Sequence, residues 1–93
     1  KVINTTLTRL AINALTNLFF SSEDSKEIFW QKKGINGLLM ILNSYDEEIV
    51  DDGLKLLHAF VIRKSDNVSK IAKEQDFAIV KSLLKKVRYQ PDI

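Results

Sequence analysis

The sequence contains no cysteine, only one proline and only three glycines. Without cysteine, the chain can form neither disulfides nor a thiolate metal site. The scarcity of proline and glycine leaves few residues for tight hairpin turns, which disfavours an all-β fold. No apolar run approaches the ~20 residues needed to span a bilayer, and no signal peptide is visible. We therefore expect a helical protein of the cytoplasm or nucleus that is not inserted in a membrane.

The bulk composition is that of one small globular domain covering residues 1–93. Hydrophobic residues make up 45% of the chain and charged residues 28%, which is too apolar for a disordered segment. The net charge of +2 is far from the strong basic bias of a dedicated nucleic-acid binder.

The spacing of apolar residues is helical along the whole chain. Leu7, Ala11, Ala14, Leu15 and Leu18 recur at helical intervals, and they predict a helix over 5–20 with these residues on its apolar face. The same pattern predicts further helices over 24–33, 35–43, 47–62, 68–74 and 77–87. We expect an aspartate cap at residue 46 and a left-handed glycine at residue 34, where helices start and stop.

A second pattern repeats across the chain. The stretch ALTNLFF at 14–20 is echoed by LLHAFVI at 56–62, and a shift of 42 positions (57 − 15) aligns most apolar positions of the two halves. Helices of long, short and medium length follow one another twice in this register. A period of 42 lies within the range of helical repeat proteins. The sequence thus predicts one three-helix unit seen about twice.

Two stretches of this unit resemble the armadillo family: IFWQKKGINGLLMIL at 28–42 and ALTNL at 14–18. The resemblance implies an all-α fold, namely an armadillo-like right-handed α-solenoid of about two stacked three-helix repeats. It also implies that the chain is a slice of a longer solenoid. A HEAT-like array and an irregular α-helical bundle remain the alternatives.

The resemblance further implies a binding surface. In armadillo proteins the asparagine that Asn17 matches projects into the concave surface and hydrogen-bonds the backbone of an extended peptide. Arg9 and Asn13 share its helix face, and Lys55 follows in the next long helix. Two departures, Ala59 in place of the second asparagine and Asn13 in place of a frequent tryptophan, favour recognition of a folded domain over nuclear import. The predicted protein-binding residues are Arg9, Asn13, Asn17, Asp52, Lys55 and His58.

No catalytic, cofactor-binding or metal-binding residues are predicted. His58 is the only histidine, and Asp51, seven residues away on a straight helix, is too far for a direct hydrogen bond. The favoured function is therefore a non-enzymatic scaffold or adaptor that binds a partner protein or peptide. The resemblance also admits Hsp70 nucleotide-exchange factors, formin regulatory domains and cohesin-release factors.

Three other groups of residues have a functional and a structural interpretation. A basic C-terminal segment leaves a nucleic-acid adaptor as a second alternative, although cations also complement a helix C-terminus. An acidic group at 46–52 suits a helix N-terminus or a basic ligand. An aromatic group is expected to fill the corner between the first two helices. These groups are Lys81, Lys85, Lys86 and Arg88; Asp46, Glu47, Glu48, Asp51 and Asp52; and Phe19, Phe20, Phe29 and Trp30.

Overall fold

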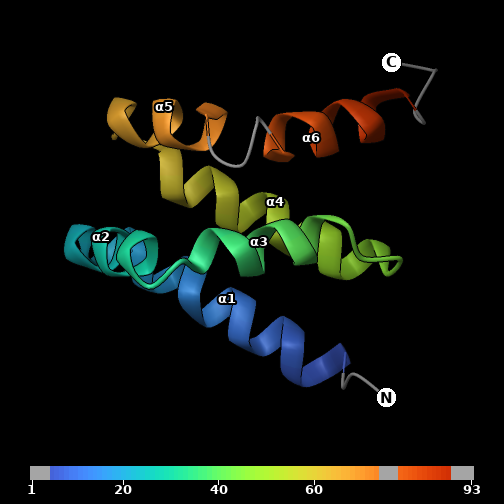
Figure 1. The fold of residues 1–93 in the computed structure, drawn as a ribbon. Helices are drawn as coiled ribbons and strands as arrows, with labels where there is room; N and C mark the ends of the chain where they lie inside the picture. Colours follow the sequence, from blue (N-terminus) through green and yellow to red (C-terminus); the bar gives the residue numbers. More distant parts are fainter. Residues whose placement is uncertain (1–4, 74–77, 89–93) are drawn as a thin grey trace.

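The computed structural model describes residues 5–73 and 78–88, and these residues form six α-helices and no strand. The predicted all-α fold is confirmed. In chain order the helices are α1 (Thr5–Ser21), α2 (Glu23–Gln31), α3 (Gly34–Leu42), α4 (Glu47–Val61), α5 (Ser65–Lys73) and α6 (Ala78–Arg88) (Figure 1).

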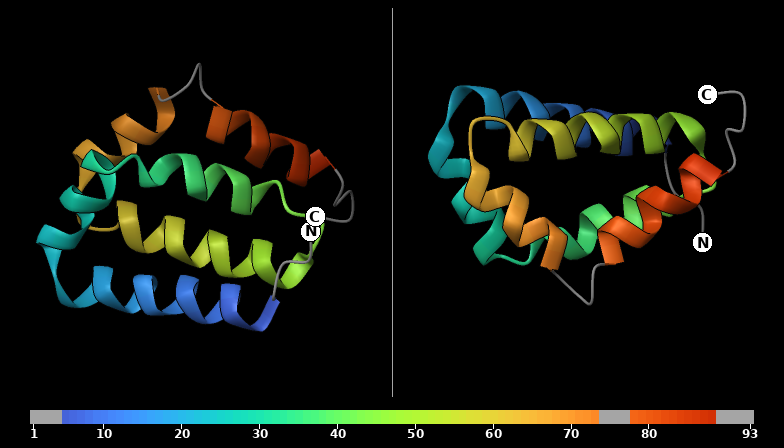
Figure 2. Two further views of the ribbon diagram at one scale, coloured as in Figure 1. Left: turned by 60° about the horizontal axis from the view of Figure 1, so that its bottom comes forward. Right: turned by 90° about the horizontal axis from the view of Figure 1, so that it is seen from above.

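The helices lie in two layers (Figure 2). The long helices α1 and α4 run parallel, side by side, in one layer. The helices α3 and α6 lie next to each other in the second layer, and the short helices α2 and α5 join the layers at one end. The most extensive helix contact is between α1 and α4, while α4 also contacts α3 and α5. The helix α4 is thus enclosed by more neighbours than α1.

The start of α4 follows from its capping residue. The side chain of Asp46 accepts hydrogen bonds from the backbone N–H groups of Glu48 (2.9 Å) and Ile49 (3.3 Å), as the sequence predicts. These bonds satisfy two donors that have no partner inside the helix.

The turn between α2 and α3 differs from the prediction. The left-handed residue is Lys33 (φ 61°), and no described glycine has a positive φ. Gly34 is instead the first residue of α3. A Cβ at Gly34 would overlap the ring of Phe29, so a glycine is required here by close packing and not by backbone conformation.

The helix α5 begins at Ser65, three residues before the predicted start. The reason lies in Asn67, which precedes the predicted helix over 68–74 but is buried. Its side-chain N–H donates to the backbone oxygen of Phe60 at 2.9 Å and ties α5 to the end of α4. The sequence contains two N-x-S/T glycosylation sequons, Asn4-Thr5-Thr6 and Asn67-Val68-Ser69. The burial of Asn67 keeps it from a glycan in the folded protein, and Asn4 lies outside the described residues.

The core lies between the two layers and is centred on aromatic rings. Phe19 and Phe60 are fully buried. Phe29 contacts both rings, at centroid distances of 5.1 and 5.6 Å, and Trp30 stacks on Phe60 at 6.3 Å. The predicted aromatic corner is confirmed for these residues, but Phe20 is 55% exposed. Aliphatic residues from α1, α3, α4, α5 and α6 complete the core: Ile12, Ile35, Leu38, Leu42, Ile49, Leu56, Ala59, Ile71 and Ile79.

The buried face of α1 is not the predicted one. Leu7 is 64% exposed and Leu18 47% exposed, and Ala11 and Ala14 are also exposed; of the predicted face, only Leu15 packs against the core. The buried residues of α1 are Ile12, Thr16 and Phe19. This helix carries apolar residues on two sides, and within the described residues only one of these sides is covered.

Candidate functional site

All six predicted binding residues lie on α1 and α4, and the structure divides them into three sets. Arg9, Asn13 and Asp52 form a hydrogen-bonded cluster between the two helices. Lys55 and His58 line a hollow on the surface. Asn17 is exposed and belongs to neither set.

The cluster is built around the carboxylate of Asp52, which is only 2% exposed. The Nε group of Arg9 donates to Asp52 Oδ2 at 2.8 Å, and Asn13 Nδ2 lies 3.2 Å from the same oxygen. Asn13 also donates to the backbone oxygen of Arg9 at 2.8 Å. At the rim, Arg9 Nη1 lies 3.4 Å from a carboxylate oxygen of the exposed Glu48. A buried carboxylate is therefore held by two donors from the neighbouring helix.

The electrostatics of the cluster follow from this geometry. The hydrogen bond from Arg9 lowers the pKa of Asp52, and it outweighs the burial that would raise this pKa. The same hydrogen bond raises the pKa of Arg9, against a smaller opposing effect of desolvation. Asp52 is thus an anion at neutral pH, but it is too deeply enclosed to contact a ligand. We assign the cluster to fixing α1 against α4.

The hollow lies beside this cluster and has a volume of about 360 Å³. Phe20 and Leu54, which are 55% and 37% exposed, supply much of its apolar lining. Lys55 and His58, which are both exposed, also line the hollow. Thr16 completes the lining, and its hydroxyl already donates to the backbone oxygen of Ile12 at 2.9 Å. The arrangement offers an apolar depression with polar edges and no group activated for chemistry.

Sequence reasoning finds Lys55 and His58 but misses Phe20 and Leu54 as surface residues, because both fall on apolar positions of a core pattern. A useful signal is the end of α1. Phe19 and Phe20 are consecutive, so one helix face cannot bury both side chains.

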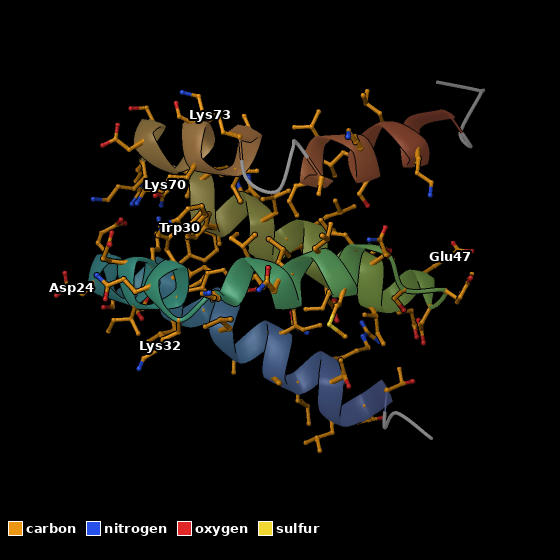
Figure 3. The ribbon with its side chains drawn as sticks, viewed as in Figure 1. Asp24, Trp30, Lys32, Glu47, Lys70 and Lys73 are labelled. Carbon is orange, nitrogen blue, oxygen red and sulfur yellow. The ribbon has the colours of Figure 1, made fainter. Side chains whose placement is uncertain are left out.

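A smaller polar depression of about 90 Å³ lies where α2 meets α5. The buried Lys26 donates from Nζ to the backbone oxygen of Ile62, at 3.1 Å, and to a carboxylate oxygen of Glu23, at 3.3 Å. Lys70 lies 5.3 Å above the ring of Trp30 and 3.5 Å from Glu27, and Figure 3 shows Lys70 and Trp30 together between the two helices. Because charges of both signs pair here, we assign these residues to joining α2 with the end of α4 and with α5.

The remaining features concern metal binding, membrane insertion and the basic residues of α6. Among residues 5–73 and 78–88, no cluster of histidine and acidic side chains has the geometry of a metal site. None of the helices in this part of the chain has the length and apolar character needed to cross a membrane. Lys81 and Lys85 are exposed on α6, whereas the side chains of Lys86 and Arg88 lie outside the described part.

Comparisons with models of protein families, with curated proteins and with solved structures find no match for this chain.

Proposed function

We propose that this chain is a unit of an armadillo-like α-solenoid, with about two repeats, that binds a partner protein or extended peptide and performs no chemistry. The helix bounds support the repeat. The helices α2 and α5, the second of each set of three, start 42 residues apart (65 − 23). We call two residues that are 42 positions apart counterparts.

The observation that carries the binding function is the hollow on the surface of α1 and α4. Its side chains stand on two helices that the buried Arg9–Asp52 pair and the aromatic core hold in a fixed relation. Side chains that are ordered before binding lose less conformational entropy when a ligand arrives. A rigid surface of this kind suits the recognition of another chain.

The chemistry of the hollow indicates what it would bind. Phe20 and Leu54 leave apolar surface in contact with water, and a large apolar side chain of a ligand would cover it. Lys55 lies beside this surface, and its positive charge would attract an acidic group. We therefore expect the preferred ligand to present an apolar residue close to an aspartate or glutamate.

A library of random peptides tests this proposal even though the natural partner is unidentified. We expect the wild-type chain to enrich peptides with an apolar residue next to an acidic one. Lys55→Glu should reverse the charge preference and enrich basic residues at the second position. Lys32→Glu is the matched control, since Lys32 is an exposed lysine at the end of α2 and does not line the hollow. This variant should enrich the same peptides as the wild type.

Circular dichroism and thermal melting would establish that all three proteins fold. Two results would contradict the proposal: no enrichment above an unrelated helical protein, or enriched peptides that bind Lys55→Glu as tightly as they bind the wild type. The second result would place the binding site elsewhere on the molecule.

A further inference from the structure

The outer side of α1 carries an exposed apolar surface. It consists of Leu10, Ala11, Ala14 and Leu18, which we call the α1 face; its two leucines are 63% and 47% exposed, and Ala11 also borders a hollow of about 300 Å³ that α1 shares with α3. The counterparts in α4 are all buried: Asp52, Gly53, Leu56 and Phe60.

The opposite end of the molecule shows the reverse relation. Leu54 of α4 is 37% exposed and Leu84 of α6 is 57% exposed, and we call this pair the α4/α6 face. Their counterparts are Ile12 and Leu42, which are 4% and 0% exposed. Both positions are thus buried in the first half of the chain and exposed in the second.

One internal interface accounts for both differences. The helix α4 packs in the angle between α1 and α3, and there a Cβ at Gly53 would lie 2.5 Å from Ile41 and 3.4 Å from Leu42. The counterparts of these contacting residues are Ala11 on the α1 face and Leu83 and Leu84 on α6. The two uncovered surfaces are therefore the two sides of an interface that the molecule already forms internally.

Resting on the repeat of the proposed function, we propose that the α1 face docks onto the α4/α6 face of a second copy of this chain. In this arrangement, α1 of one copy follows α6 of its neighbour in space as α4 follows α3 within the chain. The contact is head to tail, so each added copy leaves a free α1 face at one end and a free α4/α6 face at the other. Unless the rotation closes a ring, such a contact builds an open array.

The polar residues of the internal interface are not reproduced in this contact. Asp52 has Leu10 as its counterpart, and its two donors, Arg9 and Asn13, have Asp51 and Lys55. In the contact between copies Leu10 would therefore meet the aliphatic part of Lys55 beside the carboxylate of Asp51, and these two opposite charges, four residues apart on α4, can pair with each other. The association should consequently be driven by apolar burial and should depend only weakly on salt.

Light scattering on a size-exclusion column tests the proposal across a concentration series. The wild-type chain should pass from monomer to dimer and to higher species as its concentration rises. Leu10→Glu, which removes the α1 face, and Leu84→Glu, which removes the α4/α6 face, should each be monomeric. Tyr45→Glu is the control, because this fully exposed residue lies in the turn before α4 and on neither face, and it should associate like the wild type.

Mixing the two monomeric variants gives the sharpest result. Each retains one intact face of the opposite kind, so the mixture should form a one-to-one dimer that does not grow further. Absence of this dimer, or a Leu84→Glu variant that still dimerises through two α1 faces, would overturn the proposal. A wild-type chain that stays monomeric at every concentration would also overturn it and would leave the α1 face to another partner.

A docked copy would cover Leu54 and Lys55, which also line the hollow, so peptide binding is measured on the two monomeric variants. Neither Leu10 nor Leu84 lines the hollow, and both variants should bind the selected peptides. Peptide binding by the variants without self-association of the wild type would refute the docking alone. Self-association of the wild type without peptide binding by the monomeric variants would refute the binding function alone.

Discussion

The two long helices of this molecule carry related apolar patterns but bury opposite faces. In α4, the face containing Ile49, Leu56 and Phe60 is covered by α1 and α3. In α1, the counterparts of these three residues are exposed, and the buried side is the one that meets α4. The apolar pattern of a helix therefore identifies the faces that can be buried. The neighbouring helices determine which of these faces is buried.

The largest difference in stability between counterpart positions of α1 and α4 is expected when the central aromatic residue is truncated. Phe60→Ala should lower the free energy of unfolding by about 3–5 kcal/mol, because Phe60 is fully buried among Phe19, Phe29 and Trp30. Its counterpart variant Leu18→Ala should change this free energy by only about 0.5 kcal/mol, since Leu18 is 47% exposed. Urea unfolding measures both values. Equal losses would contradict the assigned burial.

The close approach of α3 to α4 provides the next test. Gly53→Val should cost about 1–3 kcal/mol of stability, because the added carbons would displace Ile41 and Leu42. The counterpart variant Ala11→Val adds carbons to an exposed position and should cost only about 0.5 kcal/mol through its lower helix propensity. Thermal melts of both variants would compare the two sites. A neutral Gly53→Val would mean that the helices are further apart than described.

A smaller effect is expected where α2 meets the end of α4. Lys26→Met should cost about 1–2 kcal/mol, because it removes the hydrogen bond from Nζ to the backbone oxygen of Ile62. The counterpart Val68 is 51% exposed, and Val68→Met should be close to neutral. Urea unfolding of both variants gives the comparison. A neutral Lys26→Met would show that this buried lysine contributes nothing to joining the helices.

The last test uses pH. Since the pKa of Asp52 is lowered in the folded state, its contribution to stability is complete above the ordinary aspartate pKa of about 3.9. This contribution is lost as the pH falls from there through the lower folded pKa. Asp52→Asn should therefore flatten the acid limb of the stability curve. The counterpart variant Leu10→Asn leaves the carboxylate in place and should keep the wild-type slope.

Acid titrations of the unfolding free energy, measured on the wild type and both variants, would resolve this difference. A wild-type slope that persists in Asp52→Asn would show that other carboxylates account for the acid sensitivity.

The order of the six helices is predictable from the sequence because helix starts and stops are local. The Asp46 cap and the turn before α3 both act within a few residues. Burial is harder to predict. Both sides of α1 are apolar, so no local signal could select the side of Ile12 and Phe19 over the side of Leu7 and Leu18.

The candidate site shows the same limit. Lys55 and His58 are predicted as surface residues and lie on the surface. The bond between Arg9 and Asp52 joins residues 43 positions apart, and no local pattern marks it. For the same reason the early start of α5 escapes prediction, because it depends on the contact between Asn67 and the backbone of Phe60.

The most direct test of opposite burial at counterpart positions uses the absence of native cysteine. Asn17 is exposed on α1, and its counterpart Ala59 is fully buried in α4. Single variants Asn17→Cys and Ala59→Cys can therefore be labelled with a thiol reagent under native conditions, with labelling in denaturant as the reference. We expect Asn17→Cys to react at nearly its denatured rate and Ala59→Cys to react at least ~100-fold more slowly. Similar rates at the two positions would contradict the account.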